Sequence, residues 1–254
     1  ITGDAYSDFP GFGVGLHVRK ALNYALSVRA GYNYHKASGT NHYATAMENV
    51  AADYDAILAK DPLQVAAIRT NRIIPAYETT VNDFSLELVV NLSNLKFHKS
   101  TSKWGFYAAA GIGYVAHNTN LDLLDENDKA YEWSQLGTSI SRSDNLPKVK
   151  EELDGVYETS AFTNDDLAGT KSGTYFSVAP GVSYKINKQI NISLEQKLMF
   201  TNAELLNGVV VTPSNFVNDI MSYTNLRINF NLGNPKKQVE PLYWLNPLDA
   251  PYDM

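Results

Sequence analysis

The chain has 254 residues, no cysteine and a formal net charge of −6. The lack of cysteine excludes disulfides and thiolate metal sites. The acidic balance argues against nucleic acid as a partner, because phosphate binding needs a basic surface. The sequence contains no run of about 18 apolar residues, so it predicts no transmembrane helix.

Seven segments carry an apolar residue at every second position, which is the period of a β-strand whose two faces meet different surroundings. The segments are 12–19, 24–35, 84–93, 104–117, 176–186, 190–200 and 226–232. Proline lacks the donor of a strand ladder, so Pro180 predicts a bulge or an unpaired position in the fifth segment. Gln196 interrupts the apolar face of the sixth segment once.

The connections between these segments alternate in length. Residues 20–23, 95–102 and 187–189 form short connections, whereas 36–80, 118–173 and 201–219 form long ones. In an up-and-down barrel, alternate connections lie at opposite ends, so all the long loops fall on one side. Outer-membrane barrels have this asymmetry, with short periplasmic turns and long extracellular loops.

The number of segments predicts a missing strand. Bacterial single-chain barrels have an even number of strands, with both chain ends usually in the periplasm. We therefore expect residues 1–11 to be the end of a first outer loop and an eighth strand to precede Ile1. The predicted fold is all-β: an antiparallel, up-and-down transmembrane β-barrel of eight strands with long extracellular loops. Residues 1–233 form the barrel domain of this chain and contain seven of the strands.

The apolar face of such strands could fill an inner core, as in a lipocalin, or face lipid. The opposite face is rich in glycine, serine, asparagine and alanine, which suits the crowded interior of a narrow barrel. We therefore expect the apolar face to contact lipid. Aromatic residues at both predicted rims support this, because amphipathic rings prefer the headgroup level. The predicted girdle residues are Tyr24, Trp104, Tyr184, Tyr32, Tyr34, Tyr114 and Phe200.

Several charged residues alternate with the apolar ones and are therefore predicted to point inward. They are Arg19, Arg29, Glu87, Lys185, Glu195, Lys197 and Arg227. Unpaired charges inside a narrow barrel are unfavourable, so we expect them to pair and block the channel. The hypothesis is that Glu87 and Glu195 pair with Arg29, Lys197 or Arg227, and that the barrel conducts poorly.

The long loops carry two further features. Apolar residues at helical spacing predict a short helix within 43–60. The loop from Asn118 to Ser172 is acidic. Its four carboxylates within 122–128 suggest a calcium-binding site, because calcium prefers oxygen ligands. The spacing and glycine of an EF-hand are absent, so a solvated acidic loop is the preferred interpretation.

The alternation stops at Asn234, and prolines recur from there to the end of the chain. This composition predicts an extended, Pro-rich periplasmic linker over 234–254. Together with the barrel pattern, the stretch from Val239 to Tyr252 (VEPLYWLNPLDAPY) resembles the OmpA-type outer-membrane proteins, particularly those of Bacteroidetes. The resemblance implies a barrel that precedes a periplasmic peptidoglycan-binding domain, and the residues of that domain are absent from this sequence.

The expected function is therefore an outer-membrane anchor or scaffold of a Gram-negative bacterium, which links the membrane to the cell wall through the later domain. Two alternatives remain: an accessory subunit of a larger outer-membrane complex, and a small-solute porin. No histidine lies in a nucleophilic motif, and rim histidines such as His35, His42 and His117 are more often solvated polar residues. We expect no enzyme activity, metal or cofactor. Expected partners are membrane lipid, lipopolysaccharide and other envelope proteins.

Overall fold

A computed structural model describes most of the predicted strands. The described residues are 6–7, 11–40, 74, 76–95, 103–127, 129, 131, 133, 142–160, 171–202, 220–233 and 241–245. The predicted helix within 43–60 and His42 lie outside these residues, as does most of the predicted linker. None of the helices in the described part of the chain combines the length and the hydrophobicity of a membrane-spanning helix.

All seven predicted strand segments are confirmed as long strands. They are β2 (Phe12–Ala21), β3 (Leu26–Thr40), β4 (Ala76–Asn91), β5 (Trp104–Asp122), β7 (Lys171–Lys185), β8 (Ile190–Thr201) and β9 (Ile220–Phe230). Several are longer at the long-connection end than the apolar alternation indicates. There the outward positions become polar, as at Glu78 and Asn118, while the inward Thr79 and Thr119 stay buried.

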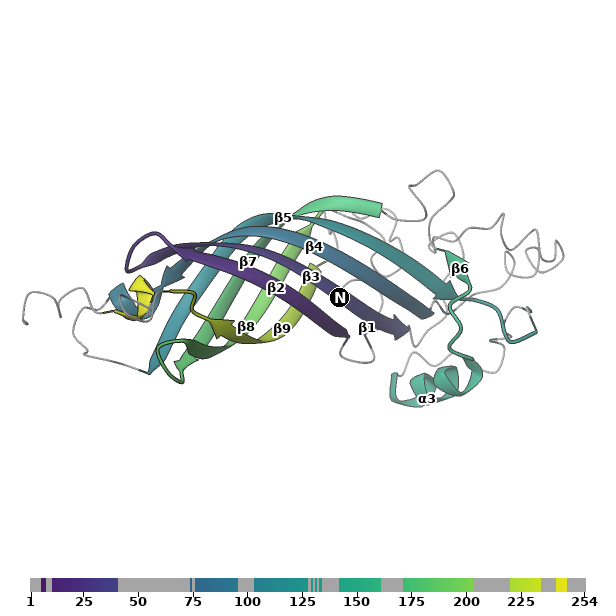
Figure 1. Cartoon of the computed structure of the whole chain (residues 1–254). Coiled ribbons are helices and arrows are strands. Elements are labelled where there is room, and N and C mark those ends of the chain that lie inside the picture. The colour runs from purple at the N-terminus through teal and green to yellow at the C-terminus, as the bar shows by residue number, and fades with distance from the viewer. Residues whose placement is uncertain are drawn as a thin grey trace, which may run out of the picture.

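The long strands form one antiparallel sheet in the order β2-β3-β4-β5-β7-β8-β9. The sheet curls into a half-barrel in which neighbours in sequence are neighbours in space (Figure 1). Two short strands extend it: β1 (Tyr6–Ser7) pairs with the end of β3, and β6 (Thr159–Ser160) pairs with the end of β5. Within the described part of the chain, β2 and β9 are the two edges of the sheet.

The two ends of the sheet differ. Asn23 and Asn187 shape two of the short turns in the same way, because each side-chain oxygen accepts hydrogen bonds from two backbone amides of its own turn. Helix α3 (Arg142–Glu152) and β6, which follow β5 and precede β7 in the chain, lie at the opposite end of the sheet (Figure 1). The predicted alternation of short and long connections is therefore confirmed.

The predicted irregularity at Pro180 is confirmed by the strand register. Pairing of β7 with β8 passes from Val178–Leu198 directly to Gly181–Glu195, so the ladder is interrupted beside Pro180. Gln196 lies opposite this gap. Its side-chain amide bonds to Ser222 and Thr224 of β9, so the polar break on the outward face is internally hydrogen-bonded.

The outward face of the sheet is apolar and exposed. Leu86, Ile112 and Ile228 have exposed fractions of 56%, 66% and 64%. The inward face is buried and carries most of the polar residues. Glycines on the inward face make room for large side chains: a Cβ atom at Gly181 would overlap the ring of Tyr107.

One described part of the predicted extended linker departs from that expectation. Residues Leu242–Trp244 form the 3₁₀ turn η5, which lies at the short-turn end of the sheet (Figure 1). Two local backbone bonds hold this turn, from Trp244 N to the Pro241 oxygen and from Leu245 N to the Leu242 oxygen. Contacts with the sheet, described below, explain why this segment is not extended.

Candidate functional site

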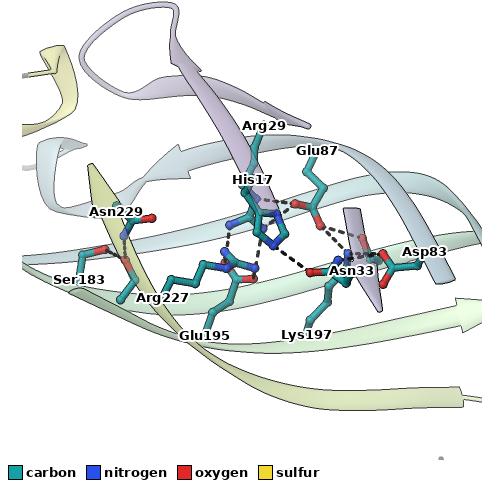
Figure 2. A network of polar contacts seen from close by, with 12 residues as sticks. His17, Arg29, Asn33, Asp83, Glu87, Ser183, Glu195, Lys197, Arg227 and Asn229 are labelled. Atoms are coloured by element: carbon teal, nitrogen blue, oxygen red, sulfur yellow. Dashed lines mark hydrogen bonds and ion pairs between the residues drawn. The ribbon is translucent and has the colours of Figure 1, made fainter. Parts of the chain in front are cut away.

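Charged side chains from four strands meet in the interior of the curled sheet. The structure brings together all five residues predicted for the network, and adds Asp83 as a sixth; we call these six residues the charge network (Figure 2). The six residues are Arg29 on β3, Asp83 and Glu87 on β4, Glu195 and Lys197 on β8, and Arg227 on β9.

Opposite charges alternate along the charge network. Lys197 Nζ lies 3.0 Å from Glu87 Oε1 and 3.8 Å from Asp83 Oδ1. Arg29 lies 2.6 Å from Glu87 and 2.6 Å from Glu195. Arg227 closes the series at 2.6 Å from Glu195. Three cations therefore face three carboxylates, and the network is balanced in charge.

The charge network joins parts of the sheet that are distant along the strand order. Arg29 and Glu87 come from β3 and β4, whereas Glu195 and Arg227 come from β8 and β9. Three strands, β4, β5 and β7, separate β3 from β8 along the sheet. The ion pairs therefore span the interior and hold the two halves of the curl together.

Asp83 is the member that the sequence pattern did not predict, and it also contacts three side chains outside the charge network. It accepts bonds from Tyr175 Oη at 2.8 Å and Asn33 Nδ2 at 3.1 Å, and it pairs with His35 Nε2 at 3.0 Å. Asp83 lies four residues before Glu87 on β4, so both side chains point to the same, inward face of the strand. The apolar alternation of the third predicted segment begins at Phe84, one residue after Asp83, so that segment did not include it.

Burial makes the charge network energetically important. The exposed fractions of the paired side chains run from 0% to 10%. Removing one partner from a buried ion pair leaves an uncompensated charge and typically destabilises by about 3–5 kcal/mol. The network is therefore a structural crosslink that tolerates little change.

Apolar layers lie on both sides of the charge network. Toward the long-connection end, Val81 packs with Val115, Tyr175, Met199 and Met221. Toward the short-turn end, Val89 packs with Tyr107, Ala109 and Ala179. The interior is thus filled by side chains above and below the charges.

The two remaining predicted inward charges do not join the charge network. Arg19 lies over the rings of Tyr243 and Tyr107, at 3.9 and 5.7 Å from their centroids, and Lys185 lies 5.7 Å from the ring centroid of Trp244. Both face the short-turn end, where η5 is found.

The predicted girdle residues lie on the outward face in two groups. Trp104 and Tyr184 contact each other at the short-turn end, with ring centroids 4.8 Å apart, and Tyr24 lies at the same end in the turn between β2 and β3. Farther along the strands, Tyr32 contacts Phe84 at 4.8 Å. Tyr34, Tyr114 and Phe200 are also outward and exposed in this second group.

The spacing of these two groups fits a membrane-sized band. Trp104 and Tyr114 are ten residues apart on β5, and transmembrane strands have about 9–11 residues. Beyond Tyr34 the outward face becomes polar, and Lys36 forms an ion pair with Glu78 at 2.8 Å. The apolar band therefore ends before the strands do.

Two predicted rim histidines occupy a different environment from the one expected. His35 and His117 are 8% and 1% exposed, respectively, so the interpretation as solvated rim residues is wrong for both. The reason is that β3 and β5 continue past these positions, and their inward faces stay covered. The interior, rather than solvent, surrounds both rings.

An acidic cluster lies where β5 ends at the long-connection end. Burial raises the pKa of Asp122 to about 7, although Tyr131 Oη and Gly155 N donate hydrogen bonds to its carboxylate. Burial also raises the pKa of Glu158, which accepts bonds from the amides of Leu123 and Leu124. No group of three or more potential metal ligands occurs among the described residues.

No family model, curated protein or solved structure matches this chain. The fold and the site define its class directly: an all-β protein whose antiparallel sheet curls into a half-barrel with an exposed apolar outer face and a charged, filled interior.

Proposed function

We propose that this chain is the membrane-embedded barrel of an outer-membrane protein, and that it serves as an anchor or scaffold rather than as a channel or an enzyme. The observation that carries the proposal is the distribution of polarity. Soluble monomers rarely expose contiguous apolar patches larger than a few hundred Å². Here apolar side chains cover the outward face from β2 to β9, while ionised groups are buried inside.

The height of the apolar band supports the proposal. Two groups of aromatic residues bound the band, and polar residues follow on the outward face beyond the second group. A bilayer favours this order, with aromatic rings at its interfaces and polar groups outside them. In this orientation the short turns are periplasmic and the long connections are extracellular.

The filled interior favours an anchor over a porin. A porin needs a continuous aqueous path, whereas here the charge network lies between two apolar layers. If the chain belongs to an OmpA-like protein, a separate periplasmic domain would bind peptidoglycan and link the membrane to the cell wall. That part of the proposal rests on the sequence resemblance alone.

Two experiments test the proposal. The chain, exported in a Gram-negative host, should fractionate with the outer membrane and migrate differently on gels before and after boiling. In planar bilayers it should show no sustained open-channel current. A stable large conductance would contradict the anchor and support a small-solute porin.

Mild-detergent purification separates the anchor from the accessory-subunit alternative. A lone anchor should elute without stoichiometric protein partners. A stable complex that survives exchange into a second detergent would favour the subunit of a larger assembly. Lipopolysaccharide and phospholipid should co-purify in either case.

A further inference from the structure

The segment 241–245 returns to the sheet after the last strand and meets inward-facing residues at the short-turn end. Asn91 Nδ2 donates a hydrogen bond to the Tyr243 carbonyl oxygen at 2.8 Å. Asn91 ends β4 and is only 4% exposed, so this bond reaches a buried part of the sheet. The segment is therefore attached to the interior and not only to the end of β9.

The two aromatic side chains of this segment have separate sites. The Arg19 guanidinium lies over the Tyr243 ring at 3.9 Å from its centroid, and it also lies 5.7 Å from the centroid of the Tyr107 ring. Gly105 provides space for Trp244, because a Cβ atom there would lie 3.0 Å from the Trp244 ring. Lys185 approaches the same indole. Strands β2, β4, β5 and β7 thus each contribute one contact.

We propose that the short-turn mouth of the curled sheet is a binding site for the Tyr243–Trp244 pair, and that this pair closes the interior at that end. The charges support the assignment: Arg19 and Lys185 are inward cations outside the charge network, and the two rings supply the faces that cations prefer. The binding also holds the chain that follows β9 against the short-turn end of the sheet. This inference stands whether or not lipid covers the outward face.

Accessibility of Ser27 tests the closure. Ser27 is 0% exposed, and its hydroxyl accepts a hydrogen bond from Arg19 Nη2 at 3.2 Å, so it lies just inside the proposed seal. The chain has no cysteine, so Ser27→Cys gives a single thiol. In the reconstituted full chain this thiol should react slowly with a small charged methanethiosulfonate. Adding Tyr243→Ala and Trp244→Ala should raise the rate at least ~10-fold, because local opening controls access.

A matched control removes the other aromatic pair at the same end. Trp104→Ala with Tyr184→Ala deletes two rings from the outward face and should leave the labelling rate of Ser27→Cys unchanged. Fast labelling in the parent, or an equal rate after removal of Tyr243 and Trp244, would overturn the proposal.

A second measurement does not depend on removing the aromatic residues. The amides of Trp244 and Leu245 are hydrogen-bonded within η5, and a free turn of this length would protect them little. Arg19→Met should speed their exchange with solvent by about 10-fold or more. Lys20→Met, which changes the adjacent and exposed side chain, should leave exchange unchanged. Equal exchange in the two variants would also overturn the proposal.

Discussion

Arg29 and Glu195 form a two-pronged ion pair across the interior, with Nη1–Oε2 and Nη2–Oε1 distances of 2.6 and 3.2 Å. The two residues are 166 positions apart in sequence. The same guanidinium also contacts Glu87. This single side chain therefore connects three strands, β3, β4 and β8.

Arg29→Met should destabilise the chain by roughly 3–5 kcal/mol, because two buried carboxylates lose a shared cation. Urea unfolding of the protein in lipid vesicles measures the change. Lys20→Met is the control, since Lys20 is exposed on the outward face. Equal stability of the two variants would show that the charge network does not hold the sheet together.

Gly181→Ala should destabilise by about 1–3 kcal/mol through overpacking, because the added methyl overlaps the Tyr107 ring. The loss should be smaller when Tyr107→Leu is already present, since the shortened side chain leaves room. A double-mutant cycle of unfolding free energies measures this coupling. Strict additivity would contradict the packing of this layer.

The folded loop around Asp122 should become more stable on acidification, because protonation removes a buried charge. The pKa of Asp122 is raised from 3.8 to about 7, so the folded loop binds protons more tightly than the unfolded chain does. Its contribution is complete below about pH 4 and is lost as the pH rises through about 7. The raised pKa of Glu158 acts in the same direction.

Amide exchange of Gly155, corrected for the intrinsic rate, measures this effect at pH 5 and pH 8. Protection should be higher at pH 5, and Asp122→Asn should remove most of the difference. Asp125→Asn is the control, because hydrogen bonds from Lys129 and Asn127 lower the pKa of Asp125. Greater protection at pH 8 in the unmodified chain would contradict the prediction.

Most of the sheet could be predicted from sequence because its two faces meet different surroundings. The alternation around Leu86 and Ile112 reports this difference directly. It disappears at Glu78 and Asn118, where both faces are polar, so the outer ends of β4 and β5 were missed. The charged partners could be predicted because they occupy the inward positions of the alternating pattern. The contact of Tyr243 with the sheet could not be predicted, because a short segment with several prolines carries no periodic signal for a distant contact.

The eighth strand remains a prediction. Both β2 and β9 run from the long-connection end to the short-turn end, so an all-antiparallel closure needs one strand of opposite direction between them. Inward donor atoms on the β9 edge lack hydrogen-bond partners among the described residues, namely Asn225 Nδ2 and Arg227 Nε. Such a strand should therefore present acceptor side chains inward.

Hydrogen exchange tests this expectation. Edge amides of β2 and β9 that have no partner strand should exchange about 100-fold faster than the amides of β4 and β5, which are paired on both sides. Equal protection of the two groups of amides in this chain would contradict a pair of open edges that a further strand must close.

Spin labels can measure whether hydrocarbon covers the outward face. Single cysteines at Leu86, Ile112 and Ile228 would each carry a spin label in the reconstituted chain. If lipid covers this face, oxygen should reach these labels readily and a polar nickel complex should not, whereas a label at Lys36 should show the reverse. Ready access of the nickel complex to all four sites would mean that water, not lipid, surrounds the outward face.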